Sequence, residues 1–254
     1  MKKNAILFLI ICVTAVLGSL FLTDYNDLIK KSSLIPLSEQ SYFIEQIDFL
    51  THSACLKREI NDTLEVSARV LARLSKNLPL AAKVINMSGK NNYAIRLLDK
   101  PFHYYATDSI GLRGDLYYLF QDSATYWFYA EGTARFLFHD YPLKGSMLVH
   151  YRPAPLLRTA FTAEIYVYPN ERMARIMLTA LLKMGFGFYA DRMILNIQRK
   201  LNKTGKLLQA KPYIFDAIIN TDTISQRYQL SDSEKQDLKE VIHIVKEERG
   251  WKYD

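Results

Sequence analysis

Five aromatic runs between Asp115 and Leu201 decide the fold that the sequence predicts. They read LYYLF (116–120), TYWFYA (125–130), ARFLFH (134–139), SMLVHY (146–151) and RTAFTAEIYVY (158–168). Aromatic and β-branched residues favour pleated strands. The breaks between the runs, including Glu131-Gly132 and Asp140–Gly145, are short enough to permit only antiparallel neighbours. We therefore predict a meander of antiparallel strands over residues 115–168.

A long helix is expected to follow the last strand. Asn170 is a good N-cap, and Glu171 suits the positive end of a helix dipole. Apolar residues then recur at helical spacing as far as Leu201. Gly185-Phe186-Gly187 lies in the middle of this pattern, where two glycines favour a break or a kink.

Shorter elements precede the aromatic runs. Ser38 is a candidate N-cap for a helix to Lys57, and Asn77 to Ile85 reads as a short helix. Residues 63–74 alternate between apolar and polar with the single exception of Leu71, which predicts a strand, although Asp62 and Glu65 would also fit the capping box of a helix. Residues 93–98 and 102–107 are predicted strands. Near the C-terminus, Ser231 and Glu234 form a capping box for a last helix.

The order of these elements resembles the helix-grip fold of the START-like (SRPBCC) superfamily. The resemblance is carried by residues 63–74, 77–85, 93–168 and 170–201, just over half of the chain, and by no sequence motif. It implies an α+β fold in which a curved antiparallel sheet wraps a long C-terminal helix around an apolar cavity. No functional residue follows from element order alone.

If the sheet does grip the helix, one face of the strands and the apolar stripe of the helix should line the cavity. Methionine adapts to irregular apolar ligands, although it also fills ordinary closed cores. The predicted ligand-binding residues are Phe136, Phe138, Phe161, Ile165, Met173, Met177, Met184 and Phe188.

Positive charge is concentrated in the same helical region. The chain carries a net charge of +7, and the segment 171–211 holds nine basic residues against two acidic ones. Such a face suits anionic lipid headgroups, although a solvated helix face has the same composition. The predicted membrane-surface residues are Arg192, Arg199, Lys200 and Lys203.

The N-terminus indicates the compartment. Lys2 and Lys3 precede an uncharged, apolar run from Asn4 to Thr23, and Asp24 follows it. This run is long enough to cross a bilayer, and the two lysines orient the N-terminus toward the cytoplasm. We expect a single-pass signal anchor with the main domain extracytoplasmic. A cleaved signal peptide, with Val16-Leu17-Gly18 near the cleavage site, would instead give a secreted or periplasmic protein.

No catalytic, metal or cofactor motif is present. His139, His150 and Glu164 could be drawn into an acid–base or metal site, but no paired His or Cys spacing and no phosphate-binding glycine loop supports it. Cys12 lies in the apolar run, so Cys55 has no partner for an intrachain disulfide. We expect neither an enzyme nor a cofactor, and no nucleic-acid partner, because the basic helix lies outside the cytoplasm.

The sequence therefore predicts a membrane-anchored domain that binds an apolar or lipid-like ligand. The alternative is a non-catalytic envelope assembly or scaffold protein with a closed core and a protein partner. The expected parts are a transmembrane segment (1–24), a juxtamembrane spacer and helix (25–60), the helix-grip-like domain (61–204) and a C-terminal helical extension (205–254).

Overall fold

The computed structural model describes residues 25–89, 93–108, 111–136, 139–181 and 187–251. Within these ranges it places every side chain except those of Phe136, Leu181 and residues 187–197 and 222–224. The predicted N-terminal anchor, residues 1–24, lies outside the described part. None of the helices in that part combines the length and the apolarity that crossing a membrane requires.

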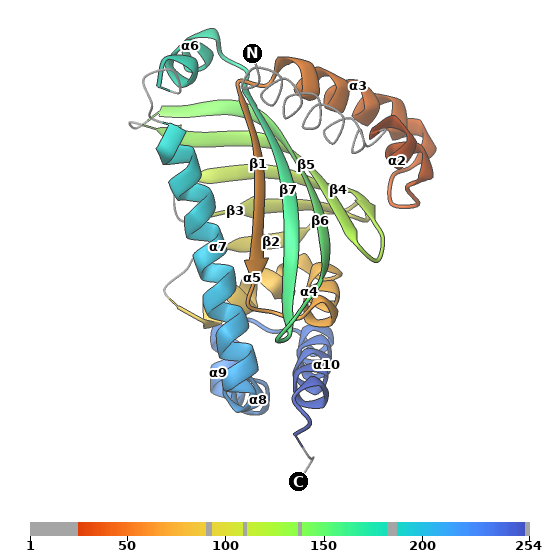
Figure 1. The fold of residues 1–254 in the computed structure, drawn as a ribbon, viewed down its shortest axis with the longest axis vertical. Helices are drawn as coiled ribbons and strands as arrows, with labels where there is room; N and C mark the ends of the chain where they lie inside the picture. The colour runs from red at the N-terminus through yellow and green to blue at the C-terminus, as the bar shows by residue number, and fades with distance from the viewer. Residues whose placement is uncertain (1–24, 90–92, 109–110, 137–138, 182–186, 252–254) are drawn as a thin grey trace, which may run out of the picture.

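A seven-stranded antiparallel sheet forms the centre of the molecule, with the strand order β1-β7-β6-β5-β4-β3-β2. Figure 1 shows that it is strongly curved. The α+β class and the antiparallel sheet are thus confirmed. The strands are β1 (Leu56–Leu64), β2 (Ala94–Leu97), β3 (His103–Thr107), β4 (Leu112–Gln121), β5 (Thr125–Phe136), β6 (His139–Ala154) and β7 (Arg158–Pro169).

Two of the predicted strand breaks were wrong, because β5 runs through Glu131-Gly132 and β6 through 140–145. Gly132 lies opposite Gly114 on β4. A Cβ atom built on Gly132 would stand 2.7 Å from the Cα of Gly114 and 2.2 Å from the carbonyl oxygen of Arg113. The glycine therefore permits two strands to approach closely, and it does not end either of them.

The predicted strand over residues 63–74 was also wrong. The strand β1 ends at Leu64, and the helix α4 (Ala68–Ser75) begins after Ser67, whose hydroxyl accepts a hydrogen bond from the amide of Val70 at 3.3 Å. Leu64, Val66 and Val70 are all buried in one apolar cluster. The alternating pattern arose because the end of a strand and the first turn of a helix bury their residues against the same core.

Two helices, α2 (Tyr25–Lys31) and α3 (Leu37–Ser53), cover the convex face of the sheet (Figure 1). Their apolar residues pack against fully buried side chains of β4, β5 and β6. This cluster contains Ile29, Phe43, Ile47, Leu50, Leu119, Trp127, Tyr129 and Leu148.

Polar contacts fix both helices to the convex face. The hydroxyl of Tyr25 donates to Glu164 at 2.6 Å, and that of Tyr42 donates to Glu131 at 2.7 Å. Burial raises the pKa of Glu131, but hydrogen bonds from Tyr129 and Tyr42, together with Lys144, outweigh it and lower the pKa overall. Glu131 thus stays ionised as a shared acceptor between α3 and the sheet.

A layer of helices lies at the other end of the molecule, at the bottom of Figure 1. Besides α4 it contains α5 (Leu78–Met87), α8 (Pro212–Asn220), α9 (Asp222–Arg227) and α10 (Asp232–Glu248). The predicted capping box of Ser231 and Glu234 is confirmed at the start of α10. Glu234 also pairs with Lys83 of α5 at 2.6 Å, which fixes the last helix to the body of the protein.

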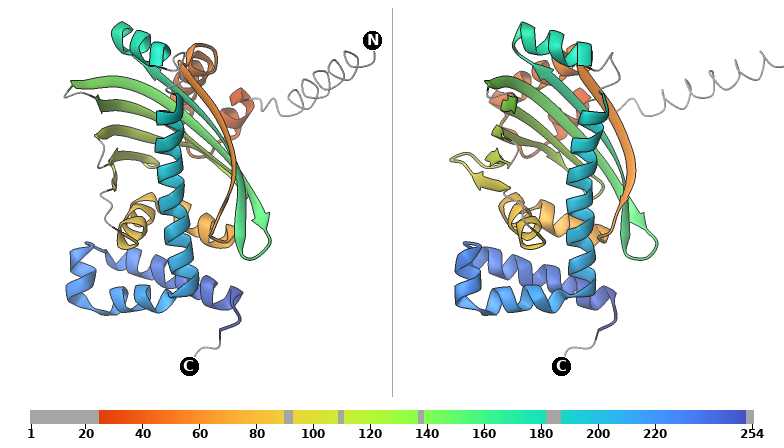
Figure 2. Two further views of the ribbon diagram at one scale, coloured as in Figure 1. Left: turned by 60° about the vertical axis from the view of Figure 1, so that its left-hand side comes forward. Right: turned by 90° about the vertical axis from the view of Figure 1, so that its left-hand side faces the viewer.

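The predicted long helix is present as two helices, α6 (Arg172–Leu181) and α7 (Gly187–Ala210), and the residues between them lie outside the described part. Figure 2 shows α7 running along the concave side of the sheet. It is attached at both sheet edges. Asn202 accepts a hydrogen bond from the amide of Glu65, just after β1, at 2.9 Å, and Lys200 donates to the hydroxyl of Tyr93, just before β2, at 3.0 Å.

The substitution Gly205→Ala tests the contact between α7 and the end of β1. A Cβ atom at this position would lie 1.9 Å from the carbonyl oxygen of Glu65. Alanine in a free helix stabilises by about 1 kcal/mol relative to glycine, whereas overpacking costs about 1–3 kcal/mol. We expect urea unfolding to show a net loss of stability. As a control, the exposed Lys206→Ala should change little, and a stabilised Gly205→Ala would show that α7 does not pack here.

Candidate functional site

The concave face of the sheet carries a continuous apolar row. Tyr118, Phe128, Met147 and Ile165 are direct cross-strand partners on β4, β5, β6 and β7. Direct partners in an antiparallel sheet point to the same face. Met147, in the middle of the row, remains 37% exposed, and Phe128 and Ile165 are half-buried. The centre of the sheet therefore presents apolar side chains that the described residues do not fully cover.

The neighbouring row on the same face has small residues at its centre. Leu116, Ala130, Gly145 and Val167 are again cross-strand partners. Ala130 and Gly145 project little from the sheet, so the surface is lower there than at Phe128 and Met147. Together, the two rows form an uneven apolar surface across four strands, with a depression at Ala130 and Gly145. Such a surface suits a small molecule better than a flat face would.

Tyrosines close one end of this surface. Tyr118, Tyr126 and Tyr151 form a buried cluster with Tyr104. The rings of Tyr126 and Tyr151 are stacked with their centroids 4.8 Å apart, and their hydroxyl oxygens are 2.9 Å apart. Burial raises the pKa of Tyr104, Tyr118 and Tyr126, which keeps these phenols neutral. This end of the surface therefore offers neutral hydroxyl groups and no phenolate charge.

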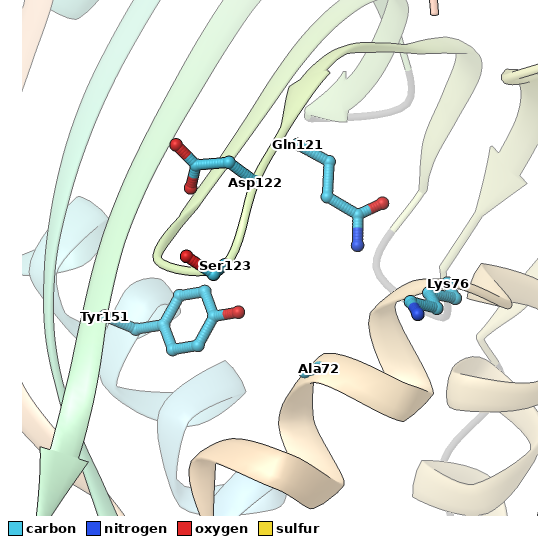
Figure 3. A pocket seen from close by; sticks show the side chains of 6 residues that line it. All are labelled: Ala72, Lys76, Gln121, Asp122, Ser123 and Tyr151. Atoms are coloured by element: carbon cyan, nitrogen blue, oxygen red, sulfur yellow. The ribbon is translucent and has the colours of Figure 1, made fainter.

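A shallow hollow of about 390 Å³ lies beside the tyrosine cluster, between α4 and the β4–β5 turn. Figure 3 shows the hydroxyl of Tyr151 and the amide of Gln121 directed into it. Lys76, Gln121, Asp122 and Ser123 contribute polar groups to the lining, and Tyr151 belongs both to the hollow and to the tyrosine cluster. Its lining residues are Ala72, Lys76, Gln121, Asp122, Ser123 and Tyr151.

The predicted ligand-binding residues are dispersed. Phe161 and Ile165 both lie half-buried on the concave face of β7, four residues apart. On α6, Met173 is 64% exposed and Met177 is half-buried. Phe136 and Phe188 have only their backbones placed, in β5 and α7, and Phe138 and Met184 lie outside the described residues.

Phe128 and Met147 were not among the predicted residues, although their strands β5 and β6 lie nearer the centre of the sheet than β7, which carries Phe161 and Ile165. Alternation along the run 146–151 separates Met147, Val149 and Tyr151 from Leu148. It does not reveal which of the two sets a helix covers. Leu148 is 1% exposed beneath α2 and α3.

The four basic residues predicted for a membrane surface differ in their surroundings. Arg199 and Lys203 are exposed. Lys200 is half-buried, donates to the hydroxyl of Tyr93, and has its Nζ 4.7 Å from the centroid of the same ring. Arg192 has only its backbone placed, in α7.

The structure does not assemble the residues from which an acid–base or metal site could be drawn. His139 and His150 lie eleven residues apart on β6, which is about 36 Å along a strand and on opposite faces. His150 contacts the hydroxyl of Thr125, and Glu164 accepts from Tyr25. Among the described residues, no three or more His, Cys, Asp or Glu side chains are grouped so that they could hold a metal ion.

Comparisons with known proteins give weak structural likenesses alone. No protein-family model matches the chain. No curated protein matches it either. Among solved structures, a conserved protein from Geobacillus kaustophilus is 14% identical with a TM-score of 0.44, over 60% of this chain and 97% of that one.

Two further solved structures are similar over about half of the chain. Ara h 8.0201 is 12% identical with a TM-score of 0.34, over 56% of this chain and 98% of that one. An uncharacterised protein from Rhizobium leguminosarum is 17% identical with a TM-score of 0.31, over 54% and 95%. With every TM-score below 0.5, these likenesses assign neither a superfamily nor a ligand, and the helix-grip resemblance stays a prediction.

Alanine substitutions at Met147 and Leu148 test which face of the sheet is covered. Leu148 is fully buried, so Leu148→Ala should cost about 2–5 kcal/mol of unfolding free energy. Met147→Ala should cost less than half as much, because the side chain is already partly in water. Chemical denaturation of the two variants measures both values. Equal losses would mean that the concave face is packed as tightly as the convex one.

Proposed function

We propose that this protein binds an apolar or lipid-like small molecule against the concave face of its sheet, on the side where α7 lies. The observation that carries the proposal is the partial exposure of Met147 in the middle of the apolar row. Transfer of apolar surface from water to a ligand is favourable by about 25 cal/mol per Å². An incompletely covered apolar face in the centre of a sheet is therefore a binding surface with a physical driving force.

The contrast between the two faces supports this proposal. On the convex face, Trp127 and Leu148 are fully buried beneath α2 and α3. On the concave face, Phe128 and Met147 occupy the adjacent positions of the same strands and remain partly exposed. Both faces carry apolar side chains at these positions. The greater exposure of the concave face therefore reflects what packs on it and not a more polar composition. A face of this kind suits an apolar ligand.

The groups around the surface favour binding over catalysis. The phenols at its closed end are neutral, and burial holds their pKa above the ordinary value. Such groups orient a ligand through hydrogen bonds, whereas acid–base chemistry needs a group that titrates near the working pH. We therefore propose a carrier or a sensor and not an enzyme.

Native mass spectrometry of the full chain in mild detergent tests the proposal. We expect the protein to take up one equivalent of 1-chlorododecane, an apolar chain without a hydrogen-bonding group. Met147→Lys should weaken this uptake at least tenfold, because the ammonium group would be desolvated against the ligand. Leu156→Lys is the control, since Leu156 is 78% exposed at the β6–β7 turn. A wild-type chain that takes up no apolar compound would refute the proposal.

We further propose that the protein is held at a membrane, with its folded part extracytoplasmic. The apolar run from Asn4 to Thr23 supports an anchor. Arg199, Lys203 and Lys206 support a membrane-facing edge, because they are exposed and recur at i, i+4 and i+7 along α7. If the apolar run is cleaved as a signal peptide, the basic edge of α7 alone would hold the protein at the membrane. That electrostatic contact would be reversible.

Vesicle sedimentation with residues 25–254 tests the basic edge. The triple substitution Arg199→Gln, Lys203→Gln and Lys206→Gln should reduce binding to phosphatidylserine-containing vesicles, because each basic residue near such a surface contributes about 1 kcal/mol. The salt dependence of binding should become shallower as well. Vesicles of phosphatidylcholine alone are the control. Unchanged binding by the triple variant would show that these residues of α7 do not contact the membrane.

A further inference from the structure

Two buried glutamines on α7 differ in whether their amides are hydrogen-bonded. Gln209 is 8% exposed, its Nε2 donates to the carbonyl of Leu157 at 2.7 Å, and its Oε1 accepts from Arg249 at 3.0 Å. Gln198 is 6% exposed, and neither its Nε2 nor its Oε1 has a hydrogen-bond partner among the described residues. One helix thus buries the same side chain twice, and only one of the two amides is satisfied.

An unpartnered buried amide is costly. Burying a polar group without a hydrogen bond loses its hydration and gains nothing in return. Most buried side-chain polar atoms in native proteins therefore have a partner, and an exception calls for an explanation. A methionine or leucine at this position would avoid the cost. The retained amide points to a partner that the described residues do not supply.

The geometry of α7 places Gln198 beside the apolar surface. Leu201 packs against the buried cluster that contains Leu64 at the end of β1, and Phe161 of β7 packs against the same cluster. Asn202 accepts from the amide of Glu65, just after β1. Gln198 precedes Asn202 by about one turn, or 6 Å along the axis. Its side chain therefore leaves α7 on the flank that faces β1, at about the level of Phe161, and Ile165 lies four residues further along the concave face of β7.

The amide also selects the chemistry of its partner. A glutamine side chain offers two donors at Nε2 and an acceptor at Oε1. A hydroxyl or a primary amide both donates and accepts, so it can satisfy both ends of Gln198. A carboxylate only accepts, so it would leave Oε1 of Gln198 without a donor. The uncharged head group is the better match.

We propose that Gln198 is the polar anchor of the ligand site and that the ligand is an apolar chain or ring system with one uncharged head group that both donates and accepts. The head group binds the Gln198 amide, and the apolar part lies along Ile165, Met147 and Phe128. This inference rests on the proposed function, since it specifies the class of ligand for the same concave surface.

The experiment compares three probes of equal chain length on the full chain by native mass spectrometry in mild detergent. The probes are 1-dodecanol, 1-chlorododecane and dodecanoate. We expect the wild-type chain to prefer the alcohol over the chloride roughly tenfold, the effect of one buried hydrogen-bonding pair. We expect dodecanoate to bind more weakly than the alcohol.

Gln198→Met is the test variant, and Gln209→Met is its matched control on the same helix. Gln198→Met should remove the preference for the alcohol, leave binding of the chloride within about twofold, and raise the melting temperature, because it removes an unsatisfied buried amide. Gln209→Met should keep the preference and lower the melting temperature, because it leaves the carbonyl of Leu157 and the side chain of Arg249 without their partner.

The outcomes separate this inference from the proposed function. If 1-chlorododecane binds the wild-type chain but the alcohol is not preferred, or if Gln198→Met keeps the preference, the role of Gln198 is overturned and the apolar site stands. A preference for dodecanoate over the alcohol also overturns it. If none of the three probes binds, both proposals fall.

Discussion

The packing of α2 and α3 on the convex face is the constraint on which the rest of the structure depends. It buries Trp127 and Leu148 completely, and hydroxyl groups from both helices fix it to carboxylates of the sheet. Burial raises the pKa of Tyr25 far above its ordinary value, so the donor to Glu164 stays protonated. Because α2 and α3 cover the centre of the convex face, the apolar residues that stay partly exposed at the centre of the sheet, such as Met147, lie on the concave side.

The helix α7 runs along the concave side and is attached near both edges of the sheet. Hydrogen bonds of Asn202 and Lys200 attach α7 near β1 and near β2, and Gly205 lets the helix approach the carbonyl of Glu65. Between these attachments the apolar rows of β4 to β7 remain partly exposed. The same helix carries Gln198, whose buried amide has no hydrogen-bond partner among the described residues.

Much of the secondary structure could be predicted because it is encoded locally. Four of the five aromatic runs lie within single strands, whereas 134–139 extends from the end of β5 to the start of β6, and Ser231 with Glu234 begins α10 as a capping box. The failures had non-local causes. The strand predicted over residues 63–74 was wrong because the end of β1 and the start of α4 bury their apolar residues in one core. The strand break predicted at Gly132 was wrong because this glycine lies opposite Gly114, where two strands approach closely. Of the candidate site, Phe161 and Ile165 were placed on the concave face, whereas Phe128 and Met147 were missed.

The sequence by itself determined that this chain forms an antiparallel sheet followed by amphipathic helices, because periodicity and capping are properties of neighbouring residues. Alternation along a strand also divides its side chains into two faces. Only the tertiary structure decided which face is covered, because Leu148 and Met147 are both apolar and differ only in what packs on them. The same holds for Gln198 and Gln209, whose amides differ only in what the fold brings within hydrogen-bonding distance.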